Sequence, residues 1–252
     1  LRVKEKTKIE KPVQICFGIL PENGVQNIKM AVRIEDEAEI SVLSHCVFPN
    51  ARRIEHIMNA DISIGKKAVY SYYEKHVHGE SGGLIVRPKA NVHLDEKSRF
   101  KTEFELLHGR VGDIAIDYEA TCGKESTLEM ITRIDGTADD TISVNETGYL
   151  VGERARGVLN SRIAVRDSAQ ATIHNKLVAE APYTRGHVDC KEIVQDKGIA
   201  AAVPIVEVKH PKAHVTHEAA IGSVDSKELE TLMSRGMPED EAVNLIINGL
   251  LQ

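Results

Sequence analysis

Residues 113–120 read DIAIDYEA, and this stretch indicates how the chain folds. In an extended strand, Ile114, Ile116 and Tyr118 lie on one face, and the other face carries Asp113, Ala115, Asp117 and Glu119. Such alternation is typical of a β-strand with one face in a core and one face in water. The stretch therefore predicts one strand of an all-β protein.

Similar runs recur for roughly 140 residues after Gly82, separated by turn signals at intervals of roughly 13 to 19 residues. They include STLEMITRI, TISVNETGYLV, GVLNSRIAV, ATIHNKLVA, HVDCKEIV, AAAVPIVEV and AHVTHEAAI. No helical pattern lies between these runs, which excludes a doubly wound α/β fold. No Asn-Gly hairpin turn separates them either. A parallel β-helix is therefore favoured, and a β-sandwich stays open as the alternative.

The composition suits thin layers of small side chains, because only 4% of the 252 residues are aromatic and none is Trp. A formal net charge of -6 gives no broad positive surface, so nucleic acid is not an expected partner. No apolar run could span a membrane and the start lacks the apolar centre of a secretion signal, so we expect a cytoplasmic protein. The four cysteines form no C-x-x-C pair, and we expect free thiols.

The pattern of apolar and polar residues divides the chain into three segments. Residues 1–35 are expected to be an N-terminal lead-in, and residues 36–224 the β-helix core. Residues 225–252 lose the strand alternation and are expected to form a C-terminal helical segment.

Two helices are predicted in that last segment. Asp225 can cap the first, with Glu228 three residues later, and Gly236 suits its end. Pro238 suits the first turn of the second. Its apolar face is expected at Ala242, Leu245, Ile246 and Leu250. The pair either caps the solenoid or forms a docking surface.

Familiar catalytic motifs are missing from the sequence. There is no phosphate-binding loop with its lysine, no nucleophile elbow, no zinc-protease motif and no dinucleotide-binding glycine motif. We therefore expect that the chain is not an enzyme by itself, and that any dependence on ATP comes from a partner.

Two candidate sites lie within strand-like runs. His76 and His78 in EKHVHGE share a face and could bind a divalent ion, but a glycine turn beside them favours an exposed strand end. Cys190 in GHVDCKEI shares its side with Val188, so a small buried hydrophobe is the simpler interpretation.

A third candidate is residues 210–222, HPKAHVTHEAAIG, with three histidines and a glutamate within nine positions. In a straight strand His217 and Glu218 point to opposite sides. A polar surface strand therefore explains the spacing better than a metal site, unless the strand bends.

The end of the chain, from GHVDCKEI at Gly186 to the closing helix, resembles the carboxy-terminal core of the SufB/SufD proteins of iron–sulfur cluster assembly. The resemblance rests on Pro204 before VEVK, the HPKA turn, HEA at 217–219 and SRGMPEDEAV at 234–243, over about 65 residues. It implies a right-handed parallel β-helix, dimers formed through that β-helix, and C-terminal helices that bind an ABC-type ATPase, SufC.

The resemblance also implies a site. In SufB, a cysteine matching Cys190 is implicated in building the cluster, and a histidine and a glutamate matching His217 and Glu218 lie near it. SufD-type chains lack that cysteine and glutamate, so the site is more similar to SufB. Thr216 replaces a further glutamate of bacterial SufB, and the chain is much shorter than bacterial SufB. It is therefore identified as a compact SufB-like member of the family.

We expect an assembly scaffold for a transient iron–sulfur cluster, with Cys190, His217 and Glu218 as ligands and His76 and His78 as weaker candidates. Thiolate, imidazole and carboxylate form a mixed and labile set for iron. The expected partners are a second copy of the chain, a SufC-like ABC ATPase docked on the C-terminal helices, a sulfur donor and an iron source. The alternative is a SufD-like regulatory partner of the ATPase that carries no cluster.

Overall fold

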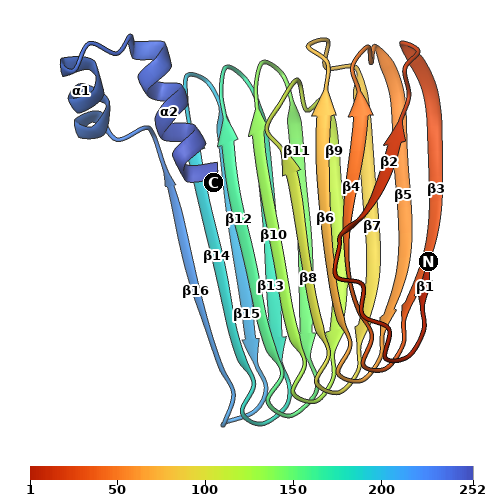
Figure 1. The fold of residues 1–252 in the computed structure, drawn as a ribbon. Coiled ribbons are helices and arrows are strands. Elements are labelled where there is room, and N and C mark those ends of the chain that lie inside the picture. Colours follow the sequence, from red (N-terminus) through yellow and green to blue (C-terminus); the bar gives the residue numbers. More distant parts are fainter. Residues whose placement is uncertain (252) are drawn as a thin grey trace.

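Sixteen strands and two helices make up residues 1–251, the part of the chain that the computed structural model describes (Figure 1). The strands form two sheets in which every pair runs parallel. One sheet holds β1 (Arg2–Val3), β3 (Asn23–Ile34), β5 (Arg53–Ile64), β7 (Leu84–Leu94), β9 (Asp113–Cys122), β11 (Thr141–Leu150), β13 (Gln170–Ala179) and β15 (Ile199–Val208). The other holds β2 (Val13–Gly18), β4 (Glu39–Phe48), β6 (Val69–His78), β8 (Arg99–Leu106), β10 (Thr127–Gly136), β12 (Arg156–Val165), β14 (Arg185–Val194) and β16 (His214–Gly222).

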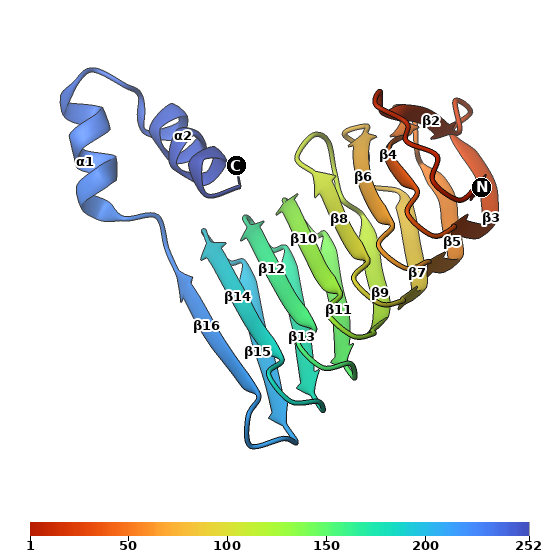
Figure 2. The ribbon, with the colours of Figure 1, turned by 60° about the horizontal axis from the view of Figure 1, so that its bottom comes forward.

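The two sheets are the opposite walls of one solenoid, because the chain alternates between them from strand to strand (Figure 2). Thr127 pairs with Arg156, Arg156 with Arg185, and Arg185 with His214, so each coil takes about 29 residues. The predicted parallel β-helix is confirmed, and the β-sandwich is excluded.

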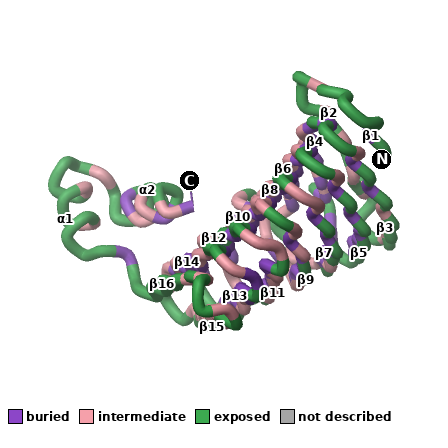
Figure 3. The backbone as a smooth tube through the Cα atoms, turned by 90° about the horizontal axis from the view of Figure 1, so that it is seen from below, coloured by how far each residue is buried: buried purple, intermediate pink, exposed green. Residues whose placement is uncertain are grey.

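Side-chain alternation along each strand fills the space between the walls. In β9, Ile114 and Ile116 are fully buried and Tyr118 nearly so, as the sequence predicts. Figure 3 shows the same alternation of buried and exposed positions along most coils. The inward positions form one continuous core from Val3 to Cys190.

The corners between the walls are built alike and tie neighbouring coils together. Lys67 and Lys97 both adopt a left-handed backbone conformation, with φ of 56° and 60°. The N–H of Lys67 donates to the carbonyl of Glu96 at 2.9 Å, and the N–H of Lys97 donates to that of Lys124 at 2.8 Å. This repeated corner needs no glycine, which is why turn dipeptides mark the coils poorly in the sequence.

The N-terminal segment differs from the lead-in that the sequence suggested. Residues 1–35 contribute β1, β2 and β3; β2 pairs with β4 and β3 with β5 of the core, while β1 pairs with β3. Val32 and Ile34 at the end of β3 are buried. The solenoid therefore begins before residue 36.

The last coil is much less buried than the others. Ile199 and Val203 of β15 are 59% and 40% exposed, and almost every residue of β16 is exposed. β16 pairs with β14 on one side only, so its other edge carries unpaired backbone groups within residues 1–251. The inward side chains Ala202 and Val215 are only partly covered.

Two helices follow, α1 (Ser226–Ser234) and α2 (Glu239–Leu251). The predicted cap is confirmed, since the Asp225 carboxylate accepts hydrogen bonds from the backbone N–H groups of Lys227 and Glu228, each at 2.9 Å. α1 has no buried residue, and α2 contacts β10 and β12. Within residues 1–251, neither helix combines the length and hydrophobicity needed to cross a membrane.

The apolar face of α2 is rotated from the predicted one. Its buried residues are Ala242, Ile247 and Leu251, whereas Leu245 is 50% exposed. Ile247 and Leu251 pack with Val224 and with Ala164 of β12. The helix therefore covers the outer face of the solenoid wall and leaves the open end of the last coil uncovered.

Candidate functional site

Strand β14 carries Cys190 toward the interior of the solenoid, one strand away from the open end. Cys190 has no exposed surface and packs in the same core as Val188. It pairs with Ser161 of β12 on one side and with Ala219 of β16 on the other. The thiol is therefore buried just beneath the most exposed strand of the fold.

His217 lies on the same face of the wall as Cys190. It pairs with Val188, two residues before the cysteine, so strand alternation directs both side chains inward. Because β16 is the last strand of its sheet, His217 is nonetheless exposed. The structure thus places the predicted thiol and imidazole on adjacent strands and on a common face.

Glu218 lies on the opposite face, as the straight-strand argument expects. It pairs with Asp189, and one of its oxygens lies 3.9 Å from Nζ of Lys191. Within one chain, therefore, Glu218 is not directed toward Cys190. Thr216, on that same outer face, exchanges a hydrogen bond with Nδ1 of His187 at 2.8 Å.

A buried carboxyl group, which the sequence analysis did not select, lies beside Cys190. Glu192 is inward-facing on the same strand, is only 2% exposed, and accepts a hydrogen bond from the Ser161 hydroxyl at 3.5 Å. Its other oxygen has no hydrogen-bond partner. Asn175 of the facing wall donates from Nδ2 to the Cys190 sulfur at 3.7 Å. An amide and a carboxyl therefore surround the thiol.

Burial sets the protonation of these groups. It raises the pKa of the Cys190 thiol to about 11, although a hydrogen bond with Ser161 opposes the shift. It also raises the pKa of Glu192 to about 7. In the closed chain at neutral pH, Cys190 is therefore a thiol rather than the thiolate that acts as nucleophile and metal ligand. In this structure the sulfur is therefore neither exposed nor ionised.

His76 and His78 do not form the exposed strand end that the glycine turn suggested. Both face inward from β6, with exposures of 0% and 6%. They follow Tyr70 and Tyr72 at even-numbered positions of the strand, and those tyrosines are also buried. The interpretation as a solvated strand end was wrong because strand parity, not the nearby turn, determines their direction.

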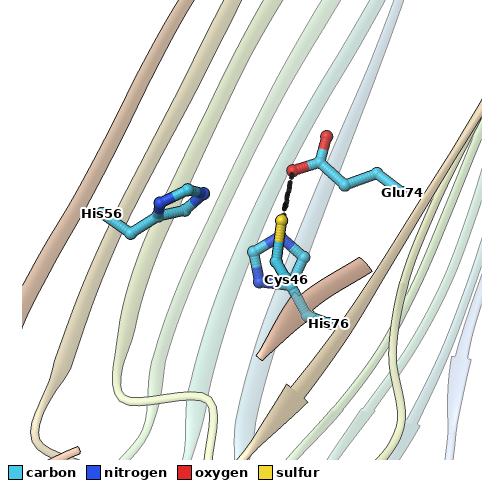
Figure 4. Close-up of side chains that lie close together, drawn as sticks. All are labelled: Cys46, His56, Glu74 and His76. Atoms are coloured by element: carbon cyan, nitrogen blue, oxygen red, sulfur yellow. Dashed lines mark hydrogen bonds and ion pairs between the residues drawn. The ribbon is translucent and has the colours of Figure 1, made fainter. Parts of the chain in front are cut away.

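His76 belongs to a second buried cluster, in the N-terminal coils (Figure 4). Cys46 comes from β4, Glu74 and His76 from β6, and His56 from β5 in the facing wall. One ligand atom of each lies within 4.8 Å of the others, and all four side chains are buried. The cluster therefore joins both walls of the solenoid.

Hydrogen bonds order one side of this cluster. Nδ1 of His78 lies 2.9 Å from the carbonyl of Arg110, and its Nε2 lies 3.0 Å from Nδ1 of His76. Nε2 of His76 lies 2.9 Å from the Glu74 carboxyl, which is 3.9 Å from the Cys46 sulfur. His56 differs, since neither of its ring nitrogens has a hydrogen-bond partner.

The apolar surroundings disfavour the charged forms of these groups. Burial lowers the pKa of His56 to about 4 and those of His76 and His78 to about 3. It raises the pKa of Glu74 to about 7, and it raises that of the Cys46 thiol as well. All cysteines of the chain are free, as expected, so Cys46 is available as a ligand.

The fold and these side chains define a class of protein: a β-solenoid whose interior holds cysteine, histidine and carboxyl groups, the ligands that suit iron and zinc. Residues 18–250 match the family model of the SufBD core domain of the SUF system for iron–sulfur cluster assembly. The chain belongs to this family.

Individual relatives agree with this assignment. The chain is 42% identical over 249 residues to an iron–sulfur cluster assembly SufBD family protein of Methanocaldococcus jannaschii, covering 99% of this chain and 79% of the relative. It is 32% identical over 251 residues to one of Pyrococcus horikoshii, covering 100% of this chain and 76% of the relative. It is 22% identical over 269 residues to the iron–sulfur cluster assembly protein SufB of Bacillus subtilis, covering 99% of this chain and 54% of the relative.

Proposed function

We propose that the chain is a SufB-like scaffold on which an iron–sulfur cluster is assembled at Cys190, in the cytoplasm. One observation carries this proposal. The buried thiol of Cys190 and the imidazole of His217 lie on the same face of two adjacent strands at the open end of the solenoid. Glu192 adds a carboxyl group on the same strand and face. Sulfur, nitrogen and oxygen ligands of this kind bind iron without excluding its later release.

The scaffold works as a homodimer joined through the last coil. Solenoids need their terminal coils capped, and here the apolar residues Ile199, Val203 and Ile221 are exposed at the end that carries the site. The free edge of β16 supplies backbone donors and acceptors for the same strand of a second copy. In such a dimer the inner faces of the two joined walls are continuous, so His217 of each protomer lies at the junction near Cys190, while Glu218 stays on the outer face.

A proline in β16 tests this interface. The N–H of His214 donates to Thr184 of the preceding coil, so parallel pairing directs the N–H of Ala219 toward the open edge. Ala219→Pro should therefore keep the pairing with β14 but yield a monomer, whereas Ala219→Val, which retains the N–H, should stay dimeric. Light scattering after gel filtration measures both masses. A monomeric wild-type protein, or a dimeric Ala219→Pro variant, would contradict the interface.

The ATPase partner opens the last coil. Cys190 is a buried thiol, so assembly of a cluster on it needs a movement that exposes the sulfur, and ATP hydrolysis by a partner can drive that movement. The α1–α2 pair directly follows β16 along the chain. A SufC-like ABC ATPase bound to these helices is thus well placed to displace β16 and uncover the thiol to a sulfur donor and to iron.

Anaerobic purification separates this proposal from a SufD-like role. A scaffold should be brown after reconstitution with ferrous iron and sulfide, and should carry both elements in proportion. A colourless protein that binds no iron or sulfide, yet stimulates an ABC ATPase, would indicate the regulatory partner instead. Cys190 favours the scaffold, because a purely regulatory chain has no need of a thiol at its open end.

A further inference from the structure

The cluster in the N-terminal coils has the dimensions of a metal site. In a tetrahedral zinc site, bonds of about 2.0–2.3 Å hold neighbouring ligand atoms about 3.3–3.8 Å apart. The ligand atoms of Cys46, His56, Glu74 and His76 already lie within 4.8 Å of one another. Each would move by only about 1 Å or less to enclose an ion of that size.

The hydrogen bonds prepare His76 as a ligand. Because the Arg110 carbonyl only accepts, Nδ1 of His78 carries a hydrogen and its Nε2 must accept from Nδ1–H of His76. This leaves a lone pair on Nε2 of His76, the atom that faces Glu74 and lies within the cluster. Histidines that bind metals usually donate their other N–H in this way, which fixes the tautomer.

His56 gives a second, independent indication that a metal ion belongs in this cluster. It has no exposed surface, and both its ring nitrogens lack partners, although an unpartnered buried polar atom costs about 1–3 kcal/mol. Phe48 and the ring of His76 lie beside it, with ring centroids 5.0 Å and 5.7 Å away. A metal ion bound between His56 and His76 would satisfy one of these nitrogens.

Charge balance also favours a divalent ion. A thiolate from Cys46 and a carboxylate from Glu74 carry two negative charges, and two neutral imidazoles carry none. One M²⁺ ion therefore gives a neutral set, which avoids the cost of an uncompensated charge in an apolar interior. The surrounding Phe48 and Phe104 rings supply that interior.

We propose that Cys46, His56, Glu74 and His76 bind a divalent transition-metal ion, with Zn²⁺ as the best fit, that ties the two walls of the solenoid together. One sulfur, two nitrogens and one oxygen in a closed set suit Zn²⁺, which also binds more tightly than Fe²⁺ to such ligands. Because all four positions are filled by the protein and the side chains are buried, the ion is structural and does not exchange with the cluster assembled at Cys190.

The test uses a Cys190→Ser background, so that metal at the open end of the solenoid does not contribute. Protein produced with added zinc should retain about one ion per chain after gel filtration. Cys46→Ser and His56→Phe should each reduce the content to less than about a tenth of an ion. His56→Phe is the cleaner change, because it removes no hydrogen bond and keeps an aromatic ring against Phe48.

A thiol control and a spectrum complete the test. Cys122→Ser alters another fully buried thiol outside the cluster and should keep the metal. Protein produced with cobalt should show the intense visible bands of tetrahedral Co²⁺ with a thiolate ligand, and His56→Phe should abolish them. Metal retained by both cluster variants would overturn the proposal, as would a background protein that holds neither zinc nor cobalt. Neither outcome bears on Cys190, which is absent from every sample.

Discussion

Replacing Cys190 with serine should abolish the loading of iron and sulfide while leaving the fold intact. The change removes the soft sulfur ligand of the proposed cluster site. It conserves volume, and the new hydroxyl can use Asn175, whose Nδ2 already donates to the sulfur and whose Oδ1 has no partner. We expect a loss of about 0.5–3 kcal/mol in the free energy of unfolding, the range of most single substitutions. Iron and sulfide analysis after anaerobic reconstitution, with a denaturation curve, measures both effects.

Cys122→Ser is the matched control for this experiment. Cys122 is also fully buried, but lies in β9, away from the open end of the solenoid. It should load iron and sulfide as the wild type does. If Cys190→Ser loaded as much as Cys122→Ser, then Cys190 would not hold the cluster, and the scaffold proposal would fail at its central residue.

Deleting residues 237–252 should remove binding of the ATPase, because this takes away α2 and the support of α1. The deletion also uncovers Ala164 and Ile193 on the outer wall, so loss of binding could follow from damage to the fold. Point variants avoid this difficulty. Met233 on α1 and Leu245 on α2 are 41% and 50% exposed, and substituting them should change stability by less than about 0.5 kcal/mol.

The double variant Met233→Asp, Leu245→Asp should weaken binding of the ATPase by at least about 30-fold, the factor that the loss of one interface hot spot produces. Co-purification and titration calorimetry measure it. Leu20→Asp is the control, since Leu20 is 71% exposed in the N-terminal coils. Residues 225–252 carry six acidic and two basic residues, so binding should also weaken as salt is raised. Wild-type affinity in the double variant would disprove docking on this face.

The repeated strands could be predicted because the alternation within each one shows which side chains face inward. Alternation at Ile114, Ile116 and Tyr118 identifies β9 without reference to any other strand. The first coils carry the same signal, since Ile28, Met30, Val32 and Ile34 of β3 alternate with polar or small residues. The interpretation of residues 1–35 as a lead-in overlooks this alternation, because the charged start and the turn signals at Pro21 and Gly24 interrupt it.

The site at the open end could be predicted in part. The opposite directions of His217 and Glu218 follow from strand parity, and the register confirms them. That they lie near Cys190 was predicted only from the family resemblance. Strand pattern alone could not predict it, because neighbouring strands of a solenoid sheet are a whole coil apart in sequence. Glu192 was missed, although it shares parity with Cys190.

Only part of the metal cluster could be predicted from the sequence. Parity with Tyr70 and Tyr72 directs Glu74, His76 and His78 inward, and that signal was available. The partners were not predictable, because Cys46 lies one coil away and His56 comes from the opposite wall. Which residues face each other across the core depends on where each coil turns, and those corners have no distinctive sequence.

Each coil bonds only to the coils next to it, so the free energy needed to open a coil depends on its position in the stack. β16 has one neighbour in its sheet and exposed side chains, so it can fray alone, and its amide hydrogens should exchange with solvent first. Strands in the middle of the stack, such as β9 and β10, pair on both sides and have several coils at either end, so their amide hydrogens should exchange last. The end that carries Cys190 can thus loosen and reseal while the middle coils keep their shape.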